Sequence, residues 1–180
     1  IGETVEELWS GIRLVKIFER KSGALGTMRF DWNCIRHAAR EDGLILTLGY
    51  NTALFNLWFR IKGIKNIINM DGLEWKRSKW SFPARVWFYI NDWAGCFIGN
   101  HLIADHPEIA KHLTTRRSKK AITMIPYGSD TIHAAPLQPI LDLGLEQNQF
   151  ALCIARPEPE NSILEIVRAF SKKTRNQKLV

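Results

Sequence analysis

Short apolar runs alternate along the chain with longer segments in which apolar residues recur at helical spacing. The runs of strand length are Arg13–Phe18, Leu44–Leu48, Lys65–Met70, His101–Asp105 and Ala121–Pro126. The segments with helical spacing are Phe30–Arg40, Ala53–Ile61, Ala84–Ile98 and Pro107–Leu113. Strands that alternate with helices form parallel sheets, because each helix returns the chain to the edge where the previous strand began. The pattern therefore predicts a doubly wound α/β domain.

Three local signals refine these elements. Asp31 is predicted to cap the helix at Phe30–Arg40, since its carboxylate can accept a hydrogen bond from a free backbone N–H. Pro83 is predicted to start the helix that runs to Ile98. Ser22–Gly26 (SGALG) reads as a glycine-rich turn, and it lacks the Lys-Ser/Thr ending of a phosphate-binding P-loop.

The pattern changes after Gly128. Residues 129–149 contain prolines and show no clear period, which indicates a connection between domains. Phe150–Ala155 then predicts the first strand of a new sheet, Ser162–Ser171 an amphipathic helix, and Lys178–Val180 the start of another strand. These pieces cannot bury a core by themselves, so the chain is expected to be an internal fragment. The expected divisions are a first domain at 1–128, a connection at 129–149 and the beginning of a second domain at 150–180.

The charge balance points to an anionic partner. The chain has 25 Lys and Arg against 18 Asp and Glu, a formal net charge of +7. That excess suits nucleic acid, lipid headgroups or a phosphorylated ligand. Because no zinc finger, RNP-type motif or helix-turn-helix is visible, nucleic acid is not expected. The longest uncharged stretch, Leu44–Phe59, is interrupted by polar residues and is shorter than the roughly 18 apolar residues of a spanning helix.

The cysteines predict reduced thiols. Cys34, Cys96 and Cys153 lie far apart and form no CxxC pair, which is typical of a cytoplasmic protein. Cys34 and His37 lie three residues apart, but no second pair of ligands accompanies them. No metal site is expected.

The densest cluster of candidate chemistry lies in Asn69–Ser81 (NMDGLEWKRSKWS). Asp71 and Glu74 directly follow an apolar strand, the position at which open α/β sheets bind ligands. The same segment contains two tryptophans and three cations, namely Trp75, Trp80, Lys76, Arg77 and Lys79. Indole rings offer flat faces to sugars, and cations offer counter-charges to phosphates. The alternative is a solvated loop whose tryptophans fold back onto the core.

Four ordered blocks resemble the family 4 glycosyltransferases. They are INMDGLEWKRSKW, NHLIADHPEIAKHL, MIPYGSD and ARPEPENSILEIVRAF. Within that family the chain is most similar to bacterial polysaccharide rhamnosyl- or galactosyltransferases. The blocks GALGTMRFDW and LTLGYNTALFN extend the resemblance over essentially the whole chain. The resemblance implies two Rossmann-like domains that face each other across a cleft, with the acceptor held by the first domain and a nucleotide sugar by the second.

The resemblance also implies a donor site. Arg156 would contact the donor pyrophosphate, since a planar guanidinium can engage two phosphate oxygens at once. Asn161 stands where relatives often have a lysine, and it would donate a hydrogen bond or cap the following helix. Glu160 and Gly128 complete the predicted donor-binding set. Alternatively, Arg156 is a surface residue that pairs with Glu158 or Glu160.

On the acceptor side, Asp71 would orient the acceptor hydroxyl or help to deprotonate it. If the anomeric configuration is retained, a donor phosphate oxygen receives that proton and Asp71 serves for positioning. Glu74 is the competing carboxylate, and the spacing does not decide between the two. Asn51 would line the cleft or, alternatively, cap a helix. The predicted acceptor-binding set is Tyr50, Asn51, Trp75 and Lys76.

The expected function is therefore glycosyl transfer from a nucleotide-diphosphate sugar to a saccharide acceptor, lipid-linked, in cell-surface polysaccharide biosynthesis. No cofactor is expected beyond the nucleotide sugar as substrate. The expected location is cytoplasmic, at the inner face of the membrane, with peripheral contact to anionic lipid. The alternative is a non-catalytic α/β domain that binds glycan or anionic membrane. Because catalysis needs both walls of the cleft, these 180 residues by themselves are expected to be inactive.

Overall fold

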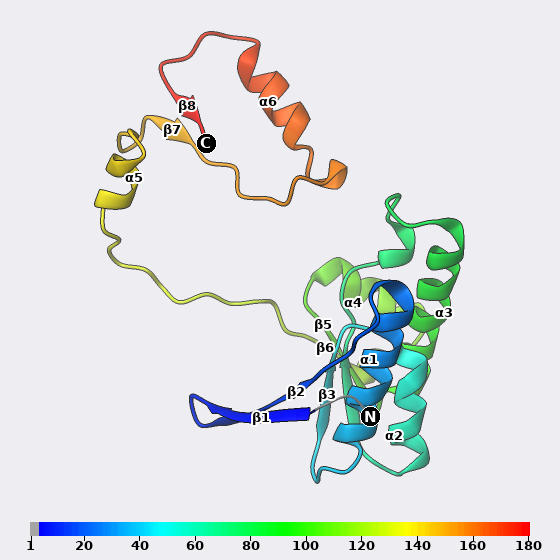
Figure 1. Ribbon diagram of the computed structural model, residues 1–180. Coiled ribbons are helices and arrows are strands. Elements are labelled where there is room, and N and C mark those ends of the chain that lie inside the picture. Colours follow the sequence, from blue (N-terminus) through cyan, green and yellow to red (C-terminus); the bar gives the residue numbers. More distant parts are fainter. Residues whose placement is uncertain (1–3) are drawn as a thin grey trace. The chain divides into compact units, whose positions relative to one another are not determined.

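The computed structural model describes residues 4–180, which divide into a first compact unit ending at Gly128 and a second from Ser129 to Val180. The centre of the first unit is a four-stranded parallel sheet in the order β3-β4-β5-β6 (Figure 1). Its strands are β3 (Ile45–Leu48), β4 (Asn66–Asn69), β5 (His101–Ala104) and β6 (Ile122–Met124). A parallel sheet flanked by helices confirms the predicted α/β, Rossmann-like fold class.

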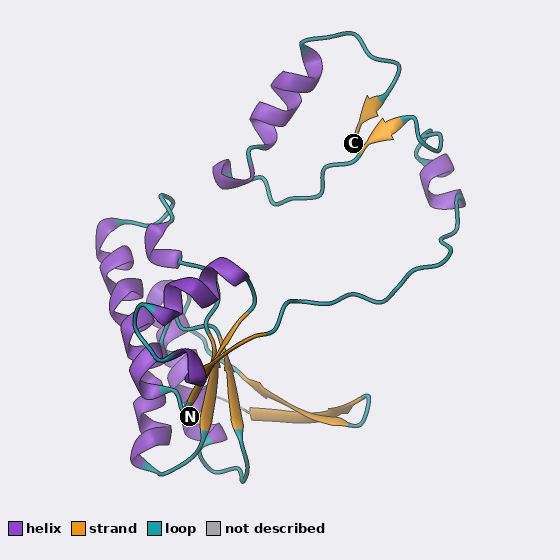
Figure 2. Ribbon diagram, turned by 180° about the vertical axis from the view of Figure 1, so that it is seen from behind, coloured by secondary structure: helices purple, strands orange, loops and turns teal. Residues whose placement is uncertain are grey.

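The helices of the first unit cover one face of this sheet (Figure 2). They are α1 (Gly23–Ala38), α2 (Leu57–Ile61), α3 (Phe82–Ile98) and α4 (Pro107–Thr114), with short 3-10 turns η1 (Ala53–Asn56), η2 (Glu74–Lys76) and η3 (Lys119–Ala121). Because the strands follow one another in chain order, right-handed crossovers place the connecting helices on the same side. On the opposite face Leu46 and Leu48 remain 53% and 76% exposed. Among residues 4–128, the second helical layer of a doubly wound sheet is not seen.

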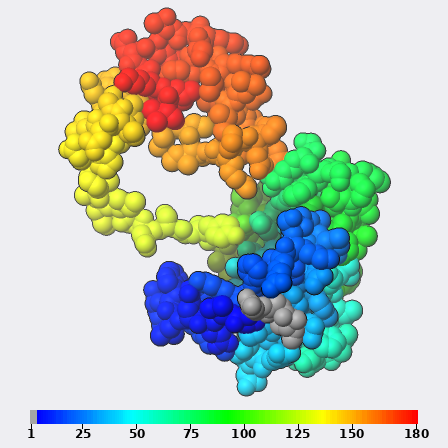
Figure 3. All heavy atoms as spheres, viewed as in Figure 1, coloured from blue at the N-terminus to red at the C-terminus, as the bar shows by residue number. Residues whose placement is uncertain are grey.

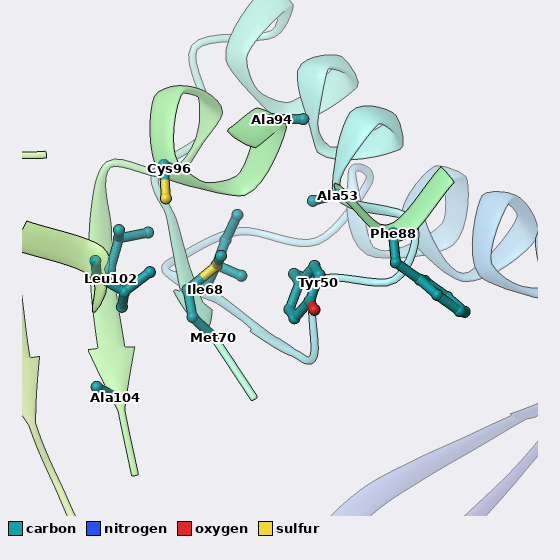
Figure 4. Close-up of a cluster of buried hydrophobic side chains, with 10 residues drawn as sticks. Tyr50, Ala53, Ile68, Met70, Phe88, Ala94, Cys96, Leu102 and Ala104 are labelled. Carbon is teal, nitrogen blue, oxygen red and sulfur yellow. The ribbon is translucent and has the colours of Figure 1, made fainter. Parts of the chain in front are cut away.

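The core lies between the sheet and α3. Ile68 and Met70 of the β4 segment point towards the helices, as does Leu102 of β5 (Figure 4). Burying each such side chain contributes about 1.5–3 kcal/mol. Gly95 lets α3 approach closely, since a Cβ there would lie 2.8 Å from the sulfur of Met70.

A buried amide fixes the turn that follows β3. Asn91 of α3 accepts a hydrogen bond from the Leu54 backbone N–H at 2.9 Å and donates to the Trp87 carbonyl at 2.9 Å. The side chain is fully buried, so both bonds form where no water competes. The turn at residues 50–54 is thereby held against α3.

The N-terminal region contains a hairpin that the sequence pattern indicated only in part. The predicted strand is β2 (Ile12–Ile17), and it pairs with β1 (Thr4–Trp9), which was not predicted. Ser10 and Gly11 both have positive φ, the geometry of a tight two-residue hairpin turn. The hairpin projects from the rest of the first unit (dark blue in Figure 3).

Helix α1 begins seven residues earlier than expected, at Gly23 rather than Phe30. The predictions of a glycine-rich turn and of an Asp31 cap are therefore wrong: Ser22 is the N-cap residue, and Asp31 lies inside the helix. The glycine signal has a packing cause, because a Cβ on Gly26 would lie 2.0 Å from the Lys21 carbonyl oxygen. Glycine admits a close approach of the chain here, within the first turns of the helix.

The second unit has little core. It contains α5 (Gln138–Asp142), η4 (Pro159–Asn161), α6 (Ile163–Ser171) and the parallel pair β7 (Phe150–Ala151) and β8 (Lys178–Leu179). Helix α5 lies in the segment expected to be an irregular connection, and β7 is shorter than the predicted strand. Within residues 129–180, Leu145 is the one apolar side chain that is buried. No helix among residues 4–180 is long and apolar enough to cross a membrane.

Candidate functional site

The carboxyl ends of the four parallel strands form the candidate site. Tyr50 and Asn51 follow β3, Asp71 follows β4, Asp105 follows β5, and Tyr127 lies just beyond β6. Parallel strands bring these ends to one edge of the sheet, where ligands bind in open α/β folds. Polar side chains from all four strand ends therefore lie at that edge.

Asp71 is exposed and lightly restrained. One of its carboxylate oxygens, Oδ1, accepts a hydrogen bond from the Gly72 backbone N–H at 2.8 Å. Its other oxygen makes no hydrogen bond with the described part of the chain. Asp71 is thus held in place locally, while one oxygen remains available to a ligand.

Glu74 has the opposite surroundings. Its Oε1 pairs with Arg77 at 2.7 Å, and its Oε2 accepts from the Trp80 indole N–H at 2.7 Å. The side chain is only 13% exposed. Both oxygens are therefore used to close the loop at residues 74–80, and Glu74 is a structural carboxylate in this conformation.

Tyr50 anchors the same loop to the core. Its hydroxyl accepts a hydrogen bond from the Glu74 backbone N–H at 2.8 Å, and the residue is 1% exposed. Burial raises the pKa of the phenol far above its ordinary value, so the group stays neutral. Tyr50 was predicted to bind acceptor, but here it positions the loop that carries Asp71 and Glu74.

Trp75 is fixed by a buried carboxylate that sequence reasoning missed. Its indole N–H donates to Asp92 Oδ2 at 2.8 Å, and Asp92 is 1% exposed. The same oxygen lies 2.5 Å from Arg116 Nη1 and 3.2 Å from His112 Nε2. A carboxylate in the middle of an apolar helix is itself a signal, since buried charges require partners.

The tryptophans of this loop therefore fold back onto the core, as the alternative interpretation held. Trp75 and Trp80 are both partly buried and pack against the core residues. Lys76, predicted to bind acceptor, lies exposed over the ring of Trp75, with its ammonium 5.2 Å from the ring centroid. The cations remain at the surface of the loop, and the ring faces that pack on the core are closed to a sugar.

Two further polar groups at the strand ends were not predicted. Asp105 Oδ1 and Asn69 Oδ1 are buried and have no hydrogen-bond partner within residues 4–180. The amide nitrogen of Asn69 donates to the Tyr127 hydroxyl at 3.4 Å. Buried acceptors without partners are uncommon in proteins, and these two lie at the carboxyl edge of the sheet. Their sequence signal is a polar residue that ends an apolar strand, in NIIN and HLIAD.

Beside this edge lies a cavity of about 570 Å³. It is lined by residues from the start of α1, the turn after β3, the loop before α3 and the first half of α3, among them Met28, Asn51, Thr52, Trp80, Trp87 and Phe88. The Thr52 hydroxyl donates to Asp31 Oδ2 at 2.8 Å, and burial raises the pKa of that carboxyl group. Asn51, one of the predicted acceptor residues, lines this cavity and caps no helix with its side chain.

The predicted donor residues lie in the second unit, except Gly128, which is exposed at the end of the first. The Arg156 guanidinium is exposed and forms no ion pair within residues 4–180. The Asn161 side chain donates to the Arg156 carbonyl at 2.8 Å and so closes the loop. Ser162, with φ of 51°, is the residue that precedes α6, so the prediction that Asn161 caps this helix is wrong. Glu160 lies exposed in η4.

Neither metal ligands nor disulfides are evident in the part of the chain that the structure describes. No group of three or more His, Cys, Asp or Glu side chains is arranged to hold a metal ion among residues 4–180. Cys34, Cys96 and Cys153 are all free thiols. Burial raises the pKa of the Cys96 thiol to about 11.

These elements define an α/β protein with a Rossmann-like parallel sheet and polar side chains at its carboxyl edge. Residues 35–130, more than half of the chain, match the family described as Domain of unknown function (DUF1972), and the chain belongs to this family. The domain is found in glycosyltransferase-associated proteins of the family 4 type. None of the curated proteins matches the chain.

Proposed function

We propose that this chain carries the acceptor side of a glycosyltransferase that acts in cell-surface polysaccharide biosynthesis. The observation that carries the proposal is the exposed carboxylate of Asp71 at the carboxyl end of β4, with one oxygen available. The occurrence of the domain in glycosyltransferase-associated proteins supports the same function. The rhamnosyl- and galactosyltransferase subgroup, indicated by the sequence blocks, is the proposed specificity class.

In the proposed reaction an acceptor hydroxyl oxygen attacks the anomeric carbon of a nucleotide-diphosphate sugar. The bond from that carbon to the diphosphate oxygen breaks, and the nucleoside diphosphate leaves with the electron pair. The hydroxyl proton passes to Asp71 or, where configuration is retained, to a phosphate oxygen of the leaving group. Asp71 then serves as base or as positioning group, both of which require a carboxylate within hydrogen-bond reach.

The donor diphosphate is assigned to the second unit. Arg156 supports this assignment because its guanidinium is exposed and without an ion-pair partner in residues 4–180. The net charge of +7 favours a peripheral position on an anionic membrane, at its cytoplasmic side. The proposed partners are thus a nucleotide sugar and a saccharide acceptor carried on lipid.

The test uses the full-length protein, with donor affinity measured by calorimetry and turnover by product analysis. Asp71→Asn should lower kcat about 100-fold or more while donor affinity is unchanged, because its role is on the acceptor side. Arg156→Ala should weaken donor binding by about 1.5–3 kcal/mol, the loss of one charge-assisted contact. Asp42→Asn and Arg168→Ala, at exposed positions outside the site, are the matched controls.

Failure of the full-length protein to bind any nucleotide sugar would overturn the proposal. Binding of glycan or anionic vesicles without nucleotide-sugar binding would identify the chain as part of a non-catalytic binding protein.

A further inference from the structure

The cavity next to the strand ends has the size and lining of a ligand site. Its volume of about 570 Å³ lies within the range of roughly 300–1,000 Å³ found for small-molecule pockets. Ala24 and Met28 of α1 form one wall, and Ala84, Trp87 and Phe88 of α3 form another. Such pockets are lined mainly by apolar and aromatic side chains with a few polar groups, and this cavity follows that pattern.

The polar groups of the wall are almost all used within the protein. The Trp80 indole N–H donates to Glu74, and the Trp87 indole N–H donates to the Asn51 carbonyl at 2.8 Å. The Thr52 hydroxyl donates to Asp31. The two indoles therefore offer only carbon surface to an occupant, and a sugar ring would lose more hydrogen bonds to water than it regained. The part of a ligand that enters the cavity must be apolar.

One polar group remains for orientation. Asn51 lines the cavity, and its side-chain amide makes no hydrogen bond within residues 4–180. Asn51 also follows Tyr50, which holds the loop that carries Asp71. The cavity thus adjoins the carboxyl edge, and an occupant could extend from one to the other.

The protein surface beside the cavity is cationic. Residues 75–90 contain four cations and no carboxylate, and one of the four, Arg77, pairs with Glu74. Lys79 lies over the ring of Trp80, one of the lining residues, with its ammonium 5.0 Å from the ring centroid. A positive surface next to an apolar cavity suits a ligand with a hydrocarbon chain and an anionic head.

We propose that this cavity binds the hydrocarbon chain of a lipid phosphate, and that this lipid is the carrier of the acceptor. The lipid-carrier part of the inference rests on the proposed glycosyltransferase function. The hydrocarbon chain of the lipid occupies the space between α1 and α3. Its phosphate lies towards the cations of residues 76–85, and the acceptor saccharide extends to Asp71.

The experiment is a chain-length series of soluble alkyl phosphates, from hexyl to dodecyl phosphate, each titrated calorimetrically below its aggregation concentration. Affinity should rise about fourfold for each methylene buried, the equivalent of about 0.8 kcal/mol, and then level off when the cavity is full. Inorganic phosphate is the headgroup control and should bind at least 100-fold more weakly than decyl phosphate.

Two variants locate the binding. Ala24→Trp fills the cavity from its rim and should weaken decyl phosphate binding at least tenfold. Leu25→Trp places the same ring on the neighbouring exposed position, outside the cavity lining, and should change the affinity less than twofold. Ala84→Leu fills the cavity from α3 and should act like Ala24→Trp, and thermal melting verifies that each variant is folded.

The outcomes separate this inference from the proposed function. If the affinity for alkyl phosphates does not change with chain length, the cavity site is overturned even if sugar transfer is intact. Equal loss of decyl phosphate affinity in Ala24→Trp and Leu25→Trp overturns it in the same way. Affinity that keeps rising with chain length and is unaffected by Ala24→Trp overturns the cavity site in favour of adsorption to a lipid surface. Binding to anionic phospholipid vesicles would reproduce such adsorption. If the protein binds decyl phosphate saturably but cannot bind a nucleotide sugar, the cavity site is supported and the proposed glycosyltransferase function is overturned.

Discussion

Two carboxylates three residues apart, Asp71 and Glu74, show how strongly local contacts decide what a side chain can do. Asp71 has one backbone hydrogen bond and is exposed, whereas Glu74 is enclosed by Arg77 and Trp80. The Glu74 carboxylate accepts hydrogen bonds at both oxygens and is only 13% exposed, so it is poorly accessible to a substrate. The geometry therefore leaves an oxygen of Asp71 accessible, in keeping with the role proposed for it, and makes Glu74 the group that shapes the loop.

Glu74→Gln should reduce the free energy of unfolding by about 1–3 kcal/mol, because the amide loses the charge that Arg77 and Trp80 contact. Asp71→Asn should change it by less than about 0.5 kcal/mol, as expected of an exposed residue. Urea denaturation of both variants measures the difference. Equal destabilisation by the two substitutions would mean that Asp71 is also structural.

Asp31 gives a pH-dependent prediction. Burial raises the pKa of its carboxyl group above the ordinary value of 3.8, so folding favours the protonated form. The loss of folding stability caused by ionising the buried Asp31 is absent at pH values below 3.8 and fully present above the raised pKa. The stability of Asp31→Asn relative to the native chain should therefore increase as the pH rises through this window. Chemical denaturation across acidic to neutral pH tests this, and an unchanged difference would contradict it.

At this scale the sequence indicated which residues gather at the strand ends better than it indicated their contacts. Asp71 and Glu74 were identifiable because they follow a buried strand, but the direction of each side chain depends on Trp80 and on Tyr50, which lies 24 residues from Glu74. Asp92 was missed because its contacts come from two distant parts of the chain, the loop at Trp75 and the region of α4 that holds His112 and Arg116. Such convergence leaves no periodic signal in the chain.

At the scale of elements, α3 organises the site. Through Asp92 it connects to the loop at Trp75 and to the region of α4 that holds His112 and Arg116. Arg116 also lies over the rings of Tyr89 and Trp93, at 5.3 and 4.4 Å from their centroids. A single buried carboxylate thus fixes the relative positions of a helix, a loop and the end of a second helix.

Asp92→Asn should destabilise the first unit by about 3–5 kcal/mol, because it leaves the buried guanidinium of Arg116 without its counter-charge. Tryptophan fluorescence should also change, since Trp75 loses its charged acceptor. Equilibrium unfolding followed by fluorescence measures both effects. Glu108→Gln, which alters an exposed carboxylate of α4, is the control. A loss below about 1 kcal/mol would show that the cluster is not stabilising.

The elements themselves were largely predictable, and their boundaries less so. The four strands of the parallel sheet were found because short apolar runs of strand length are conspicuous. The start of α1 was missed because Gly23 and Gly26 look like turn residues, while the close approach of Lys21 that requires Gly26 exists only in the folded chain. Strand β1 was missed because it is exposed along its whole length and has no buried face to produce alternation.

At the scale of the whole molecule, the two units of the chain differ in how much of a buried core they have. The first has a buried core between sheet and helices, whereas α6 of the second keeps Leu164 and Val167 about half exposed. Because buried contacts are distributed unevenly between the two units, their local stabilities are also expected to differ.

Hydrogen exchange should show this difference directly. Amides of β4 and β5 should be protected by the full unfolding free energy of the first unit, and those of α6 should exchange at least 100-fold faster, equivalent to about 2.7 kcal/mol. Mass spectrometry of peptides from both units provides the measurement. Protection of α6 equal to that of α3 would contradict the division.

The order of strands in the parallel sheet, identical to their order along the chain, has a consequence for biosynthesis. Each of β4, β5 and β6 pairs with the strand synthesised immediately before it, and only one helical connection must close each time. Short loop closures favour rapid folding, and domains begin to fold while the ribosome is still adding residues. This sheet is thus suited to grow one strand at a time from the nascent chain, without an early strand waiting for a distant partner.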